Sequence, residues 1–272
     1  MSATTAPDIR LVVTDMDGTL LDGQGRIPDT LWPLLAGLRR RGIVFSPASG
    51  RQYATLARQF RQAAEGMVFI AENGAYVVQD DRELSSAPLE RAVVEEAVRT
   101  VRGLPAGVDA GTVVCGKKSA YVERTDDAFL AEASRYYAEL RQVEDLTAVD
   151  DEVIKLAFHD FGRADEGTGP ALRRFADTHQ VVLSGQHWID IMAPGTDKGT
   201  AVRRLQERLG VTPDQTVVFG DYLNDLEMLS TATWSYAMAN AHPDVKRRAR
   251  HLAPAHTEDG VVTVLTELLG PA

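Results

Sequence analysis

Short runs of apolar and β-branched residues alternate with amphipathic segments near the N-terminus. The runs at 9–14, 43–46 and 67–71 are predicted to be buried strands. Between them, the spacing of apolar positions predicts helices over about 28–41 and 51–64. Strands that alternate with helices in this order predict a parallel sheet with right-handed crossovers.

The same alternation returns in the last third of the chain. The predicted elements are a helix at 197–209, a strand at 216–219, a helix at 222–230, a strand near 233–238 and closing helices at 243–249 and 259–268. The fold class is therefore predicted as α/β, with a Rossmann-like parallel-sheet core built from residues 1–83 and 191–272.

The middle of the chain has a different pattern, in which helices lie beside pairs of short strands. In order, we expect a helix at 88–102, strands at about 110–115 and 119–124, a helix at 126–140, a strand at 153–159, a helix at 169–178, and strands near 180–185 and 187–192. This order predicts an antiparallel sheet with helices on one face. We interpret residues 84–190 as an inserted α+β cap domain, with breaker-rich hinges at 85–88 and 193–195.

Composition narrows the class of protein and of partner. A chain of 272 residues suggests two domains, and 44% hydrophobic with 25% charged residues is typical of a globular protein. The formal net charge of −10 argues against nucleic acid or an anionic membrane as partner, because either requires a basic surface. A small anionic substrate stays open, since a bound metal and a few cations can reverse the local potential.

Cellular location is predicted from the cysteine count and from the apolar runs. Cys115 has no second cysteine to pair with, which fits a reducing compartment. No uninterrupted apolar stretch is long enough to cross a bilayer, and residues 1–8 lack the parts of a signal peptide. We therefore expect a cytoplasmic protein, either a monomer or a homodimer.

Two pairs of carboxylates follow predicted buried strands. Asp15 and Asp17 come at the end of the first strand, and Asp221 and Asp225 follow the strand at 216–219. The carboxyl ends of parallel strands meet at the edge where open α/β sheets bind ligands. Acids crowded there repel one another, and a hard cation such as Mg²⁺ relieves that repulsion. Alone, each acid also fits a turn or a helix cap.

An aspartate at this edge can act as a nucleophile on phosphorus. Attack by Asp15 would give an aspartyl-phosphate and divide a very slow hydrolysis into two easier steps. Asp17 could then protonate the leaving oxygen and later deprotonate the attacking water.

Several other residues at the same edge could bind phosphate. Ser49 and Gly50 end the second strand, where Ser49 is expected to open a helix as its N-cap, and Arg51 weakly supports anion binding. Lys198 falls in the first turn of a predicted helix, where a nearby anion would offset the unfavourable macrodipole. Asn224 could donate to a phosphate oxygen, and Asn73 lies in an Asn-Gly turn at this edge.

These stretches together resemble the haloacid dehalogenase superfamily of phosphohydrolases. Its four motifs are matched in order by Asp15-Met16-Asp17-Gly18-Thr19-Leu20, by Ser49, by Lys198, and by Gly220-Asp221 with Asn224-Asp225. The large insertion and the segment 238–241 resemble the Cof-like subgroup.

The resemblance implies Mg²⁺-dependent hydrolysis of a phosphate monoester. It assigns Asp15 as nucleophile and metal ligand, Asp17 as general acid/base that lends its carbonyl to the metal, and Asp221 as the remaining ligand, supported by Asp225. It also implies that the phosphoryl oxygens are held by Ser49, Gly50, Lys198, Asn224 and the Met16 backbone amide.

The substrate is less defined by the sequence. We expect a small phosphorylated metabolite, with a sugar phosphate as the leading hypothesis, and cap contacts from Lys117, Tyr121, His159 and Trp188. Two alternatives stay open: a sugar phosphomutase of the same superfamily, and a non-catalytic module that binds metal or phosphate. The presence of Asp17 argues against the module, because a binder does not need a proton donor.

Overall fold

The N- and C-terminal parts of the chain meet in one parallel sheet. The structure, a computed structural model, describes residues 7–270, so most of the polar tail at 1–8 lies outside the described residues. Five strands form the sheet in the order β14-β13-β12-β1-β2. Their bounds are Leu11–Thr14 (β1), Val44–Pro47 (β2), Thr216–Gly220 (β12), Trp234–Met238 (β13) and His251–Ala253 (β14). The predicted fold class, a mixed α/β fold with a parallel core sheet, is confirmed.

The central strand β1 is buried along its whole length, which explains its β-branched composition. It pairs in parallel with β12 on one side and with β2 on the other. The helices of this part are Leu31–Arg40 (α1), Tyr53–Phe60 (α2), Lys198–Leu209 (α6), Leu226–Leu229 (α7), Pro243–Arg248 (α8) and Gly260–Leu269 (α9). In α1, apolar residues three and four apart bury one face against the sheet, including Leu31, Leu34 and Leu38.

The third predicted strand, β3 (Val68–Ala71), leaves the parallel sheet. It pairs antiparallel with β4 (Tyr76–Gln79), which in turn pairs with β5 (Arg82–Ser86), and neither of these two strands was predicted. A single parallel bridge from Ala48 to Ile70 connects β3 with the end of β2. The sharp turn Glu72–Gly74 reverses the chain and gives β3 a nearer partner in β4.

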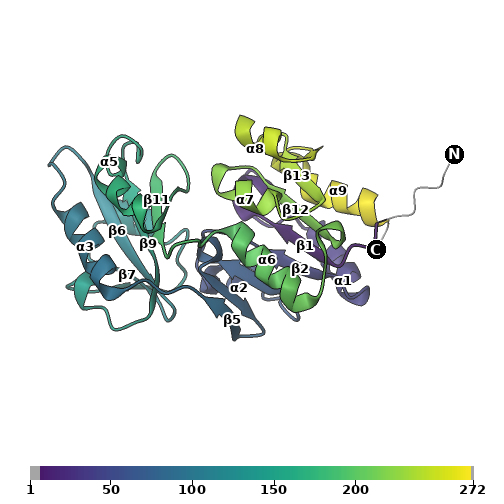
Figure 1. Cartoon of the computed structure of the whole chain (residues 1–272), viewed down its shortest axis with the longest axis horizontal. Helices are drawn as coiled ribbons and strands as arrows, with labels where there is room; N and C mark the ends of the chain where they lie inside the picture. The colour runs from purple at the N-terminus through teal and green to yellow at the C-terminus, as the bar shows by residue number, and fades with distance from the viewer. Residues whose placement is uncertain (1–6, 271–272) are drawn as a thin grey trace.

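The middle of the chain forms a separate six-stranded sheet, seen on the left of Figure 1, in the order β10-β11-β9-β6-β7-β8. The strands are Ala110–Gly116 (β6), Ala120–Val122 (β7), Leu140–Gln142 (β8), Val153–Asp160 (β9), Gln180–Leu183 (β10) and Trp188–Met192 (β11), and the helices are Arg91–Arg102 (α3), Asp127–Ala133 (α4) and Gly169–Leu172 (α5). All pairs are antiparallel except β7 with β8.

The helix predicted at 126–140 is wrong in its second half, because α4 ends at Ala133. The backbone of 136–139 bonds instead to the start of α2, where Thr55 Oγ1 donates to Tyr136 O at 2.7 Å. The helix predicted at 169–178 is α5 followed by a 3-10 segment, Arg173–Asp177.

Both division points of the predicted domains, at 83/84 and 190/191, stay a prediction; β11 itself runs two residues further, to Met192. Within residues 7–270, no helix combines the length and the apolar character that crossing a membrane requires.

Candidate active site

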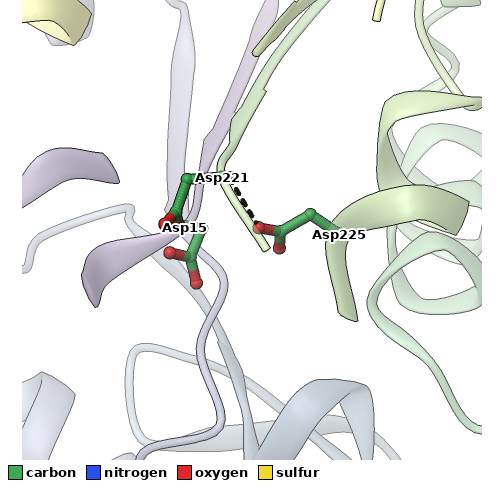
Figure 2. Close-up of side chains that lie close together, drawn as sticks. All are labelled: Asp15, Asp221 and Asp225. Carbon is green, nitrogen blue, oxygen red and sulfur yellow. Dashed lines mark hydrogen bonds between the residues drawn. The ribbon is translucent and has the colours of Figure 1, made fainter. Parts of the chain in front are cut away.

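Three carboxylates from separate segments meet at the carboxyl edge of the parallel sheet. Asp15 follows β1 and Asp221 follows β12, and the register of Thr14 with Phe219 brings the two strand ends side by side. Asp225 comes from the helical turn before α7. One oxygen from each of the three lies within 4.8 Å of the others. Figure 2 shows the three side chains close together. The predicted convergence of these acids is therefore present.

Lys198 lies inside this carboxylate cluster. Its Nζ is 2.5 Å from Asp15 Oδ1 and 2.8 Å from Asp225 Oδ1, and its side chain is fully buried. Lys198 is the first residue of α6. Asp197 caps this helix, because its side chain accepts a hydrogen bond from Thr200 N at 2.7 Å. Burial lowers the pKa of Lys198, but the two carboxylates outweigh burial and raise that pKa above its ordinary value. Lys198 is therefore a protonated cation.

One lysine does not balance three acids. Burial raises the pKa of Asp15 well above its ordinary value; Lys198 opposes this shift, and Asp225 and Asp221 add to it. Burial and the neighbouring Asp225 also raise the pKa of Asp221, to about 7. Oxygen ligands crowded in this way suit a hard divalent cation, which would favour the ionised form of each acid. The donor set therefore fits a divalent metal ion.

The segment after Asp15 wraps around Asp221. Gly18 has a φ of 78°, and a Cβ built on it would lie 2.4 Å from Asp221 Oδ2, so only glycine fits. Thr19 Oγ1 donates to Asp221 Oδ1 at 2.9 Å, and Asn240 Nδ2 donates to Gly18 O at 2.8 Å. The segment 238–241 therefore contacts the loop that surrounds Asp221.

Asp17 is held by Arg51, a pairing that the sequence did not reveal. Arg51 Nε donates to Asp17 Oδ2 at 2.7 Å and Nη2 to Oδ1 at 2.5 Å, a bidentate arrangement. The guanidinium also lies 5.4 Å from the centroid of the Tyr136 ring and donates to Arg135 O. No local pattern could have shown this, because the partners come from two loops and from the six-stranded unit.

Ser49 does not open a helix as expected. The helix α2 begins at Tyr53 with Gln52 as its N-cap residue, and Ser49 lies in the bend that follows β2. Its N–H donates to Ile70 O at 2.9 Å, and its Oγ accepts from Arg51 N at 3.1 Å. The hydrogen bond from the Ser49 N–H to β3 fixes the bend, so α2 begins only at Tyr53.

Asn224 and Asn73 contact each other. Asn224 Nδ2 donates to Asn73 Oδ1 at 3.1 Å, and Asn73 Nδ2 donates to Asp190 Oδ2 at 2.6 Å. Asn224 lines the cavity described below, whereas Asn73 is buried and does not line it. The Met16 side chain is fully buried in the core, so a ligand could meet only its backbone.

A cavity of about 210 Å³ opens above the carboxylates, between the two sheets. The parallel-sheet side contributes Asp15, Asp17, Ser49, Gly50, Arg51, Asp221, Tyr222 and Asn224. The opposite side contributes Tyr136, Tyr137, Lys155, Ser184, Gly185, Trp188 and Asp190. The cavity is therefore lined by acids, amide donors and four aromatic rings.

Among the four expected cap contacts, Trp188 lines this cavity. The other three have different partners. Lys117 pairs with Glu83 at 3.0 Å and with Glu152 at 2.9 Å. The Tyr121 hydroxyl donates to Asp151 Oδ2 at 3.0 Å, and the ring of His159 packs against that of Trp188 at 4.8 Å. Sequence reasoning missed Tyr136, Tyr137 and Lys155, which carry no local motif.

Comparison with known proteins identifies one matching family and several similar proteins. The family described as "haloacid dehalogenase-like hydrolase" matches residues 12–265. The chain is 31% identical to the 5-amino-6-(5-phospho-D-ribitylamino)uracil phosphatase YbjI of Escherichia coli (strain K12) over 264 residues, covering 96% of each chain. It is 28% identical to the HMP-PP phosphatase of Cronobacter sakazakii, covering 89% of each. The crystal structure of SMU.1108c from Streptococcus mutans superposes with a TM-score of 0.87 at 28% identity, covering 97% of this chain and all of the other.

Proposed function

We propose that this chain, which belongs to the haloacid dehalogenase-like hydrolase family, transfers phosphoryl groups to Asp15. It is a phosphatase of the Cof type, and its relatives act on phosphorylated metabolites. The proposal extends to the roles of the site residues, to a Mg²⁺ ion and to the class of substrate. The observation that carries it is the position of Asp15, fixed by Lys198 and facing a cavity of metabolite size.

In the first half-reaction, Asp15 would attack phosphorus and the bond from phosphorus to the ester oxygen would break. Lys198 holds one Asp15 oxygen at 2.5 Å, which orients the carboxylate and favours its ionised, nucleophilic form. Asp17 would give its proton to the leaving oxygen, so that an alcohol departs.

In the second half-reaction, Asp17 would take a proton from water while the water oxygen attacks phosphorus. The bond from phosphorus to Asp15 breaks, and inorganic phosphate leaves with the Asp15 carboxylate restored. The pair with Arg51 supports this base role, because it fixes the Asp17 carboxylate at the cavity wall.

The remaining assignments follow the cavity lining. Ser49, Gly50 and Asn224 would donate to the phosphoryl oxygens, together with the Met16 N–H and Lys198, and Asn73 would orient Asn224. Asp15, Asp221 and the Asp17 carbonyl would hold a Mg²⁺ ion, supported by Asp225. When bound, the ion would supply positive charge to the phosphoryl oxygens and to the crowded acids.

The walls of the cavity suggest what the leaving group carries. Tyr136, Tyr137 and Trp188 face the carboxylates across the cavity, and the Trp188 ring lies 5.4 Å from that of Tyr136. Flat aromatic walls favour a planar ring in the ligand. The relative from Escherichia coli is named for a phosphoribityl chain joined to a uracil ring. We therefore propose a sugar or sugar-alcohol phosphate that carries such a ring, in a cytoplasmic setting.

A direct test compares phosphate release from several esters, with Mg²⁺ or with chelator, beside Asp15→Asn. The panel contains p-nitrophenyl phosphate, ribose 5-phosphate and 5-amino-6-(5-phospho-D-ribitylamino)uracil. We expect Mg²⁺-dependent release that falls by about 10³-fold or more in Asp15→Asn, with Asp29→Asn, an exposed acid, as control. Turnover that persists in Asp15→Asn would remove the nucleophile assignment. Isomerised sugar phosphate without net phosphate release would identify a mutase instead.

A further inference from the structure

A buried lysine reaches from the six-stranded sheet into the parallel-sheet part of the molecule. Lys155 lies on β9, and only 1% of its surface is exposed. Its Nζ donates to Gly50 O at 2.7 Å, lies 2.5 Å from Glu72 Oε2 and is 3.8 Å from Asp190 Oδ2. Gly50 and Glu72 belong to the parallel-sheet part, and Asp190 lies on β11, so the lysine links both parts.

The turn that receives this lysine is strained. Glu72 and Asn73 have φ values of 50° and 54°, in the left-handed region that non-glycine residues rarely adopt. Both side chains are buried. Glu72 meets Lys155, while Asn73 donates to Asp190 at 2.6 Å and to Ser184 at 3.2 Å. We call Glu72, Asn73, Lys155 and Asp190 the junction cluster.

The junction cluster holds every carbonyl of the loop 49–51. Asn73 N donates to Ser49 O at 2.9 Å, Lys155 donates to Gly50 O, and Glu72 N donates to Arg51 O at 3.1 Å. Among the hydrogen bonds of residues 7–270, none uses the Gly50 N–H, which is thus left for a ligand in the cavity that Gly50 lines. Lys155 is the one of these three donors that comes from the six-stranded part.

We propose that Lys155 is a positioning residue, which orients the Gly50 peptide so that the phosphate site is complete only when the six-stranded part is docked. The inference rests on the proposed function, because it assumes that the loop 49–51 meets the phosphoryl group. Asn73 extends the same coupling to the other side of the site, since its Oδ1 accepts from Asn224.

Two other roles for Lys155 fit the geometry less well. A substrate-binding lysine needs an ammonium that is free to meet the ligand, but Lys155 Nζ already donates to Gly50 O and is ion-paired with Glu72 and Asp190. Replacing a buried ion pair by apolar residues is often neutral or stabilising. A buried charge such as that of Lys155 is therefore poorly explained by a role in stability alone.

The test measures phosphate-site affinity directly, without turnover. The variant Lys155→Met/Glu72→Gln removes both charges of the close pair, while Asp190 keeps its hydrogen bonds from Asn73 and Ser184. The control is Lys117→Met, since Lys117 also lies in the six-stranded part and contacts two carboxylates, Glu83 and Glu152, away from the cavity. Binding of orthovanadate and of inorganic phosphate is measured by titration calorimetry with Mg²⁺ present, and folding by thermal melting.

We expect both anions to bind the double variant about tenfold more weakly, with KM raised in parallel, while Lys117→Met binds as the wild type does. Lys155→Arg, which keeps the charge and a donor, should recover part of the affinity. Wild-type affinity in the folded double variant would overturn the proposal. Failure of that variant and of Lys155→Arg to fold would also overturn it, by showing a role in stability alone. If wild-type protein binds vanadate but hydrolyses no ester, the proposed function fails while this test still stands.

Discussion

Lys198 Nζ lies 2.5 Å from Asp15 Oδ1, although the two residues are 183 positions apart in the sequence, and both side chains are almost entirely buried. This contact joins the start of α6 to the end of β1. It also gives the proposed nucleophile its nearest positive charge.

Replacing Lys198 by Met should destabilise the protein and stop catalysis. Asp15 and Asp225 would lose their common cation while still buried, and breaking a buried pair in this way costs about 3–5 kcal/mol. Urea unfolding in chelator measures the loss, and Mg²⁺ should restore part of it. The exposed Lys246→Met serves as control. Equal unfolding free energies of Lys198→Met and wild type would contradict the buried pair.

Asp17→Asn should separate proton transfer from metal binding. The amide cannot exchange a proton with the leaving group, so kcat with a poor leaving group should fall by about 10²–10⁴-fold. Metal affinity should stay close to wild type, because the proposed metal contact of Asp17 is its backbone carbonyl. Calorimetry of Mg²⁺ binding beside steady-state kinetics gives both values. Unchanged kcat would exclude a proton-transfer role.

Gly18→Ala should damage the carboxylate cluster without touching its charges. The added Cβ would lie 2.4 Å from Asp221 Oδ2, and the φ of 78° is unfavourable for alanine. We expect weaker metal binding and at least about 1 kcal/mol of lost stability. Gly25 has a similar φ of 72°, but a Cβ built on it would meet no other atom. Gly25→Ala therefore measures the loss of stability that comes from the backbone conformation alone. Identical behaviour of the two variants would show that the contact with Asp221 is unimportant.

Stability without metal should fall as the pH rises from about 4 to 7. The pKa of Asp221 is raised from 3.8 to about 7, so in this range the folded state binds more protons than the unfolded state. Between pH 5 and pH 7 the part of this loss that comes from Asp221 should amount to about 2 kcal/mol. Urea unfolding in chelator at several pH values tests this, with Asp221→Asn expected to flatten the slope. Added Mg²⁺ should stabilise the protein most above pH 7. Stability that rises over this range in chelator would contradict the prediction.

Trp188→Leu should weaken recognition of a planar leaving group. Trp188 forms part of the aromatic wall of the cavity, and a leucine keeps the site apolar without a flat ring. We expect KM to rise about three- to tenfold for 5-amino-6-(5-phospho-D-ribitylamino)uracil and to change little for ribose 5-phosphate. Parallel changes for both esters would argue against a ring-binding role.

The sequence by itself determined the parts of this protein that depend on short-range patterns. The apolar run of β1 and the acids that follow it are adjacent in the chain, as are β12 and Asp221. Because parallel strands share a carboxyl edge, these local patterns were enough to predict the fold class and the meeting of Asp15 with Asp221. The position of Lys198 at the start of α6 could likewise be predicted from the neighbouring residues.

Only the tertiary structure decided the partners of Asp17 and Lys155. Arg51 reaches Asp17 across 34 residues, and Lys155 reaches Gly50 across 105, from a strand with no motif of its own. The departure of β3 from the parallel sheet and the unwound segment after α4 depend on such contacts too. Side-chain pairing between distant segments follows from how the two sheets pack, which no periodicity along a single segment encodes.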